Sequence, residues 1–200
     1  MTSPERSPSE FTDALARPER APGGIGAAAY TAAMGLALFE KALAHPAENQ
    51  AWPAGQERHV LTALRARALA LQAKDEKAMA TMDRALGQPA GTDLAMAVAG
   101  ARLLAYRSAR RLLDTTIQGL TQLQAVLDLS DVSVVTDVEV GRRLVVAAQE
   151  AAIAAAEDHL RSMDPGFADS ERQALESQAQ QGRELVARAE GALSWRRGKA

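Results

Sequence analysis

The sequence predicts an all-α protein, a bundle of five to six long helices. Alanine, the strongest helix former, makes up roughly a fifth of the 200 residues, and aromatic residues only 4%. Apolar residues recur at helical spacing over long stretches. Only the short run 132–135 is rich in β-branched residues, and no second run could pair with it. It therefore predicts a buried connection and not a strand.

The amino-terminal half predicts three helices that proline and glycine separate. Ser9 can cap a short helix that Pro18 ends. A glycine-rich segment, 22–26, then opens a helix that reaches about Ala44. The next helix covers 56–86 without proline or glycine, and its apolar stripe carries one carboxylate: Leu64, Ala68, Leu71, Asp75, Ala78 and Met82.

The carboxy-terminal half predicts three further segments. A helical pattern runs over 94–129, with Gly119 as the candidate for an interruption. Thr136 and Glu139 have the spacing of a capping box, which would open a helix that reaches Met163. The sequence 164–166 breaks that helix, and Asp169 or Ser170 is expected to open a last, polar helix that ends near Trp195.

These elements predict one domain at 9–195, between a disordered tail at 1–8 and a frayed basic tail at 196–200. The first residues contain no hydrophobic stretch of the signal-peptide kind. The longest uncharged apolar run, 25–39, is shorter than the ~20 residues that cross a bilayer. We therefore expect a cytoplasmic protein that does not bind a membrane.

Composition excludes several classes of function. The chain has no cysteine, so disulfides and thiolate chemistry are excluded. Its three histidines have unrelated spacings, and no metal site is predicted. With 23 basic and 25 acidic residues the net charge is -2, which predicts no nucleic-acid partner.

Small residues share one face on two of the predicted helices, and such faces let helix backbones approach closely. The pattern fits a homodimer interface and a bundle interior equally well. One face contains Ala28, Ala32, Gly35, Phe39 and Ala42; the other contains Gly141, Val145, Ala148, Ala152 and Ala155.

Three features are candidates for chemistry. Glycines at a helix start allow unusual backbone angles and expose N–H groups to a ligand, although a simple turn also explains them. Asp75 lies among apolar residues, where a carboxylate must be paired or have a raised pKa; an edge position paired with a cation in solvent is the alternative. Asp137 suits a site in a cleft, but also complements the dipole of its helix.

Several segments, in this order, resemble the formiminotetrahydrofolate cyclodeaminase / methenyltetrahydrofolate cyclohydrolase family. The resemblance covers roughly 9–195, and no single motif in it is very specific. The segments are 10–16, the Pro-Gly-Gly segment and small-residue helix of 21–29 and 34–38, Asp75 with Ala78, the Thr-Asp of 135–141, and the Asp-Pro-Gly-Phe of 164–167, which opens the last helix in the family.

The resemblance implies an all-α homodimer that acts on a tetrahydrofolate derivative and holds no tightly bound cofactor. Asp75 would be the acid/base and Asp137 a second carboxylate that orients the substrate or a water. The implied ligand-binding residues are Pro22, Gly23, Gly24, Ile25, Gly26 and Thr136. Arg107, Arg110 and Arg111 are candidates for the glutamate tail of folate only because they cluster, and a solvated helix face explains them as well.

This sequence departs from the family pattern at several points. Ile25 and Gly26 replace a glycine and a serine of the family loop, and the family's basic segment after the second helix is replaced by 45–52, which has no lysine or arginine. The alternative to an enzyme is therefore a catalytically silent dimer that binds folate or a protein partner, and a purely structural helical scaffold is a third interpretation.

Overall fold

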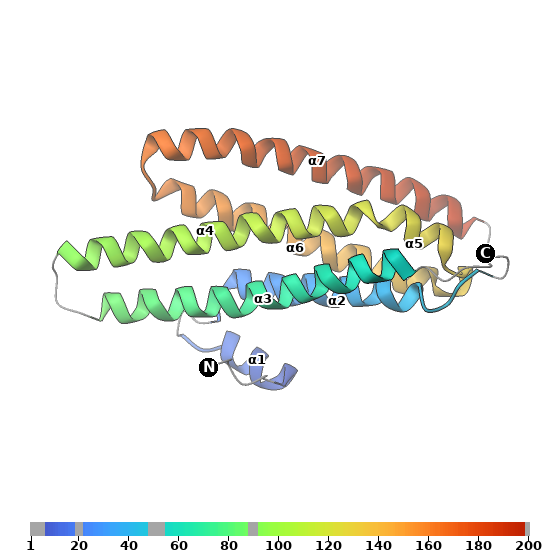
Figure 1. Ribbon diagram of the computed structural model, residues 1–200, viewed down its shortest axis with the longest axis horizontal. Coiled ribbons are helices and arrows are strands. Elements are labelled where there is room, and N and C mark those ends of the chain that lie inside the picture. Colours follow the sequence, from blue (N-terminus) through green and yellow to red (C-terminus); the bar gives the residue numbers. More distant parts are fainter. Residues whose placement is uncertain (1–6, 19–21, 48–54, 88–91, 199–200) are drawn as a thin grey trace.

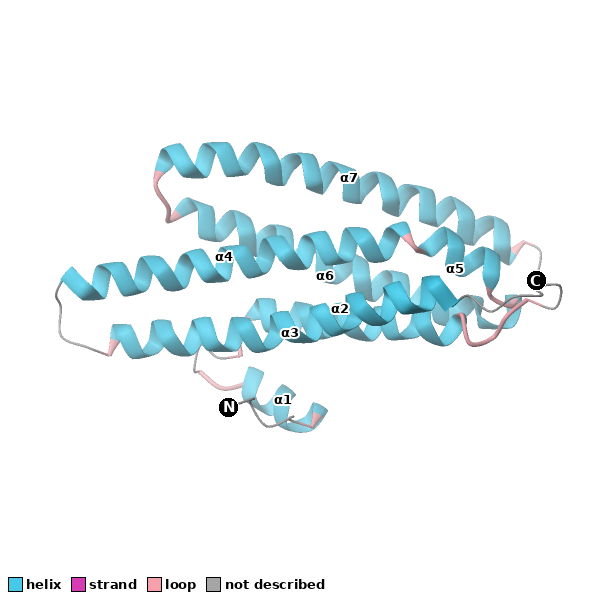
Figure 2. Ribbon diagram, in the orientation of Figure 1, coloured by secondary structure: helices cyan, strands magenta, loops and turns pink. Residues whose placement is uncertain are grey.

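The computed structural model describes residues 7–18, 22–47, 55–87 and 92–198, and this part of the chain is helical, as predicted (Figures 1 and 2). An isolated bridge between Pro46 and Ser130 is its one β-type pairing, and the run 132–135 forms no strand. The helices are α1 (Pro8–Leu15), α2 (Gly24–Ala42), α3 (Gly55–Leu86), α4 (Thr92–Thr121), α5 (Leu123–Leu129), the 3₁₀ turn η1 (Val132–Val134), α6 (Val135–Arg161) and α7 (Pro165–Arg197).

The long helices lie side by side in an elongated bundle, and α1 lies outside it (Figure 1). Helix α2 packs against both α3 and α6, and α4 packs against the same two helices. Helix α1 contacts α2 through the rings of Phe11 and Tyr30, whose centroids are 5.1 Å apart. Within the described residues, none of the helices combines the length and apolar character needed to cross a membrane.

The small-residue faces of α2 and α6 pack against each other inside the bundle. A Cβ atom on Gly35 would lie 2.6 Å from the carbonyl oxygen of Gly141, and a Cβ on Gly141 would lie 2.9 Å from that of Gly35. Only glycine permits this approach. The bundle-interior alternative is therefore correct, and these inner faces are not free to form a dimer interface.

The first helix starts two residues earlier than predicted. Ser7, not Ser9, is its cap: the Ser7 hydroxyl accepts from the Glu10 N–H, and the Glu10 carboxylate accepts from the Ser7 N–H at 2.7 Å. Pro8 occupies the first helical position, where its missing N–H costs nothing. This proline places the cap at the residue before it.

The predicted capping box at Thr136 and Glu139 does not form. Asp131 caps the 3₁₀ turn instead, by accepting from the Ser133 N–H at 2.8 Å, and α6 continues directly from that turn without a side-chain cap of its own. The Glu139 carboxylate instead accepts hydrogen bonds from Arg142 and Arg143. The break between α4 and α5 falls at Gln122, three residues after Gly119.

The last helix also begins earlier than Asp169 or Ser170. The Asp164 carboxylate caps α7 by accepting from the Phe167 N–H at 3.1 Å, and Pro165 is its first residue. The family resemblance predicted this start correctly, because it included the Asp-Pro-Gly-Phe segment. At the other end, Arg196 lies inside α7 and donates to the Ser130 carbonyl, so it is not part of a frayed tail.

Candidate active site

Asp75 lies on the inner face of α3. All six residues of the predicted stripe are buried, and Asp75 is only 2% exposed. No lysine or arginine pairs with it in the part of the chain that the structure describes. The prediction of a buried position is therefore correct, and the alternative of a solvent-exposed ion pair is wrong.

The amino terminus of α2 meets the Asp75 carboxylate. The N–H of Gly26 donates to Oδ2 of Asp75 at 3.0 Å. Gly23 is the N-cap residue of α2 and has no side chain to accept from the first helical N–H groups. Asp75 therefore supplies from α3 the acceptor that α2 lacks, and the helix dipole favours its negative charge.

Burial dominates the electrostatics of this carboxylate. Burial raises the pKa of Asp75 above its ordinary value, and the neighbouring Glu76 charge raises it further. Hydrogen bonds from the backbone of Gly26 and Gly23 lower the pKa but do not cancel the effect of burial. A carboxyl group with a raised pKa can hold or release a proton closer to neutral pH, which is the property of an acid/base catalyst.

The glycine segment has a different geometry from the one expected. Gly23 has φ -89° and ψ 177°, which is ordinary extended backbone, so unusual angles do not explain it. A Cβ atom on Gly24 would meet nothing within 4 Å, whereas one on Gly26 would lie 3.5 Å from Oδ2 of Asp75. Pro22 is buried beside this point, and the side chain of Ile25 packs in the core, not toward a ligand.

Asp137 does not lie beside Asp75 in this chain. Its carboxylate forms an ion pair with Lys41 at 2.8 Å, near the carboxyl end of α2, and the neighbouring Thr136 is exposed. Gly26 and Lys41 are fifteen residues apart on that helix, so the two carboxylates are separated by ~22 Å along it. The implied site is therefore split between the two ends of α2.

Similarity to known proteins shows the family of this chain. The model of the formiminotransferase-cyclodeaminase family matches residues 7–177. The chain belongs to this family. Its structure is similar to the crystal structure of formiminotetrahydrofolate cyclodeaminase from Thermotoga maritima, with a TM-score of 0.82, 17% identity, and coverage of 95% of this chain and 96% of that one. No curated protein matches the chain at the threshold applied.

The arginine cluster of this cyclodeaminase-family chain has a structural explanation. Arg110 donates to the hydroxyl of Tyr106 and to the Glu171 carboxylate, both at 2.9 Å, and Tyr106 donates to the same carboxylate. Burial and this carboxylate raise the pKa of Tyr106 to about 12. Arg107 and Arg111 are exposed and line a polar groove of about 430 Å³.

The buried ionic cluster of α6 was not predicted from the sequence. Glu139 accepts from Arg142 at 2.9 Å and from Arg143 at 2.7 Å, and Arg197 of α7 approaches it at 3.7 Å. The guanidinium groups of Arg142 and Arg143 hold the pKa of Glu139 down to about 2. Arginines at i+3 and i+4 were the available signal. The described residues contain no group of three or more histidine, aspartate or glutamate side chains placed to hold a metal.

Proposed function

We propose that this chain is a folate enzyme of one-carbon metabolism, either a formiminotetrahydrofolate cyclodeaminase or a 5,10-methenyltetrahydrofolate cyclohydrolase, with Asp75 as its acid/base. The observation that supports this most is the buried carboxyl group of Asp75 at the Gly26 end of α2, in a chain of this family. The substrate is a tetrahydrofolate derivative. Proton transfer is the chemistry required, so a single positioned carboxyl group suffices.

The proton balance of the deaminase reaction suits one carboxyl group. The formimino group on N5 is protonated, and N10 of the same substrate attacks its carbon to form the C–N10 bond. The bond from that carbon to the amino group then breaks and releases ammonia. N10 loses one proton and the departing nitrogen gains one. Asp75 takes the first proton as a carboxylate and returns it as a carboxylic acid. In the hydrolase reaction the same group takes a proton from the attacking water as the C–O bond forms. It returns this proton to N5 as the C–N5 bond breaks, and the second proton of the water is released to solvent.

The substrate approaches from the exposed side of Gly24. A Cβ atom there would meet nothing within 4 Å, so the backbone at this residue is open to a ligand. Gly26 lies two residues later in the same helical turn, and its N–H donates to the Asp75 carboxylate.

We further propose that the chain acts as a homodimer through the outer face of α2 and α6. Both helices expose an apolar stripe there, in which Met34 is 43% and Val140 is 44% exposed. The stripe of α2 carries no charge before Lys41, and the stripe of α6 contains the small exposed residues Ala147, Ala151 and Ala154. Such a face is suited to an isologous interface between two copies.

A twofold axis near Met34 would bring Asp75 of one chain close to Asp137 of the other. Met34 lies eight residues from Gly26 and seven from Lys41, which is ~12 Å and ~10 Å along the helix. An antiparallel pair of α2 helices around that axis therefore places Gly26 of one protomer beside the partner's Lys41 and the partner's Asp137. In this arrangement each site takes Asp75 from one chain and Asp137 from the other.

Turnover tests the assignment of Asp75. The purified protein is assayed with 5-formimino- and 5,10-methenyltetrahydrofolate, and the substrate that is consumed distinguishes the lyase from the hydrolase. Asp75→Asn should lower kcat by ~100-fold or more, whereas Asp169→Asn, which changes an exposed carboxylate on α7, should leave it unchanged. If the parent binds tetrahydrofolate in a thermal-shift assay but turns over neither substrate, the enzyme proposal fails and the silent member is correct.

Mixing two inactive variants tests the shared site. Asp75→Asn and Asp137→Asn proteins are unfolded together and refolded at equal concentration. Half of the dimers then contain one chain of each kind, and each mixed dimer has one intact site and one doubly substituted site. The mixture should recover about a quarter of the parent activity. No recovery, or full activity of Asp137→Asn alone, excludes a site shared in this way. Light scattering must also give a dimer that Met34→Arg dissociates.

A further inference from the structure

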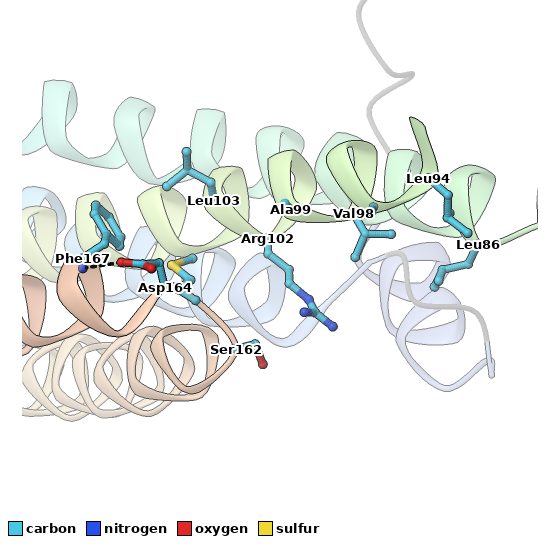
Figure 3. Close-up of a pocket in the computed structure, with 11 residues that line it drawn as sticks. Leu86, Leu94, Val98, Ala99, Arg102, Leu103, Ser162, Asp164 and Phe167 are labelled. Carbon is cyan, nitrogen blue, oxygen red and sulfur yellow. Dashed lines mark hydrogen bonds between the residues drawn. The ribbon is translucent and has the colours of Figure 1, made fainter. Parts of the chain in front are cut away.

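An apolar groove lies at the end of the bundle where α3 and α4 extend beyond the turn between α6 and α7 (Figures 1 and 3). The groove has a volume of about 670 Å³, and its wall is formed by Leu86, Leu94, Ala95, Val98, Ala99, Arg102, Leu103, Ser162, Met163, Asp164 and Phe167. Asp75 is not among its lining residues.

The groove has the size and lining of a small-molecule site. Pockets for small ligands have volumes of ~300–1,000 Å³ and are mostly apolar with a few polar groups. Large apolar side chains are left in solvent at both ends: Leu86 is 48% and Phe167 is 40% exposed. Covering these side chains would remove apolar surface from water, which favours an occupant with an apolar body.

Arg102 supplies the polar group. It lies on the groove side of α4, one helical turn after Val98 and Ala99, and Figure 3 shows its guanidinium extended away from Asp164. No described residue forms a hydrogen bond or ion pair with it. Its charge acts on His159, whose pKa is lowered by burial first and also by Arg102.

The other charged group of the groove is already occupied. The Asp164 carboxylate accepts from the Phe167 N–H and caps α7, so it has a structural partner. Arg102 is thus an unpaired cation beside an apolar wall. A guanidinium binds carboxylates through two parallel N–H···O bonds, which are stronger than neutral hydrogen bonds.

We propose that this groove binds an organic carboxylate with an apolar body, the body along Val98, Leu103 and Phe167 and the carboxylate on Arg102. This site is separate from the acid/base function proposed for Asp75. Two sources share the chemistry, an acyl chain and an aryl ring, and the experiment distinguishes them.

The probes are decanoate, 4-butylbenzoate and decanamide, titrated into the full chain by calorimetry. Decanoate and 4-butylbenzoate have the same charge on an acyl and an aryl body, and decanamide has the acyl body without the charge. We expect at least one carboxylate to bind. Arg102→Met should weaken the binding of that carboxylate ~10- to 100-fold and leave decanamide binding unchanged, because a charge-assisted bond is lost while the apolar stem is kept.

Two further variants control for folding and net charge. Ala99→Trp fills the groove and should abolish binding of all three probes, while the circular-dichroism spectrum shows that the helices remain. Arg188→Met removes an exposed arginine that is ~30 Å away along α7, and it should bind the carboxylates as the parent does. The proposal is overturned if neither carboxylate binds, if Arg102→Met binds them as the parent does, or if Ala99→Trp only dissociates a dimer. Because no probe contains a pterin, these results are independent of folate turnover.

Discussion

Replacing Gly35 by alanine tests the central contact of the bundle. The added Cβ atom would lie 2.6 Å from the carbonyl oxygen of Gly141 and 2.7 Å from Cγ2 of Val145. Carbon atoms in contact normally stay 3.5–4.0 Å apart, so α2 and α6 would have to separate by about 1 Å. The nearest obstacle is backbone, which cannot rotate away as a flexible side chain can.

The expected loss of stability follows from two opposing effects. Overpacking of a core costs ~1–3 kcal/mol, and a backbone obstacle places Gly35→Ala at or above the upper end of that range. Alanine gains ~1 kcal/mol over glycine in a helix interior. The net loss is therefore ~2 kcal/mol or more, which lowers Tm by roughly 4–8 °C in a chain of this size.

Gly191→Ala is the matched control. Gly191 lies within α7, and a Cβ atom there would meet nothing within 4 Å. Only the gain in helix propensity remains, so this variant should be more stable by ~1 kcal/mol, with a Tm ~2–4 °C higher. Urea unfolding and thermal melts at several fixed protein concentrations measure both variants. If Gly35→Ala is as stable as the parent, α2 and α6 do not meet at Gly35, and the helix packing described above is wrong.

Three further predictions concern carboxylates and are measured by chemical unfolding, the first two against pH and the third against salt. The folded-state pKa of Asp75 is raised above its ordinary 3.8, so the free energy of unfolding falls as pH rises through that raised value. Asp75→Asn should lose this pH dependence and be more stable than the parent at high pH. An unchanged pH dependence would contradict the burial argument. The pKa of Glu139 is lowered from 4.5 to about 2, so the stability that it contributes is complete above pH 4.5 and is lost as pH falls toward 2. Glu139→Gln should cost roughly 3 kcal/mol at neutral pH because it leaves Arg142 without its main partner. A variant as stable as the parent would exclude the cluster as a source of stability. Asp137→Ala should cost about 0.3–1 kcal/mol through loss of its charge near the start of α6, and 1 M salt should reduce that difference.

The sequence predicts α3 in most detail, because a long helix with a single apolar stripe has one possible buried face. All six residues of its stripe are buried, Asp75 among them. The small-residue faces of α2 and α6 could not be assigned in the same way. A close contact inside a bundle and one between two chains select the same small residues, so only the position of Gly141 opposite Gly35 separates them.

The candidate site shows the same limit at longer range. Periodicity places Asp75 on the inner face of α3, but it does not say which part of the chain, 49 residues away in sequence, donates to that carboxylate. The glycines at the start of α2 were a candidate from the sequence, and the structure supplied the register that brings Gly26 to Asp75. The same register separates Asp137 from Asp75 by most of the length of α2, a distance that no local motif reports.

Glu139 shows why a capping motif fails when arginines compete for the same side chain. Its spacing from Thr136 satisfies a capping box, in which a glutamate accepts one backbone N–H. The side chain instead accepts from Arg142 and Arg143, and Arg197, 58 residues later in the chain, also approaches it. A buried carboxylate is far more costly to leave without a cation than a helix end is to leave without a cap. Because Val134 and η1 continue into α6 without a gap, the first turn loses little when Glu139 turns toward the arginines.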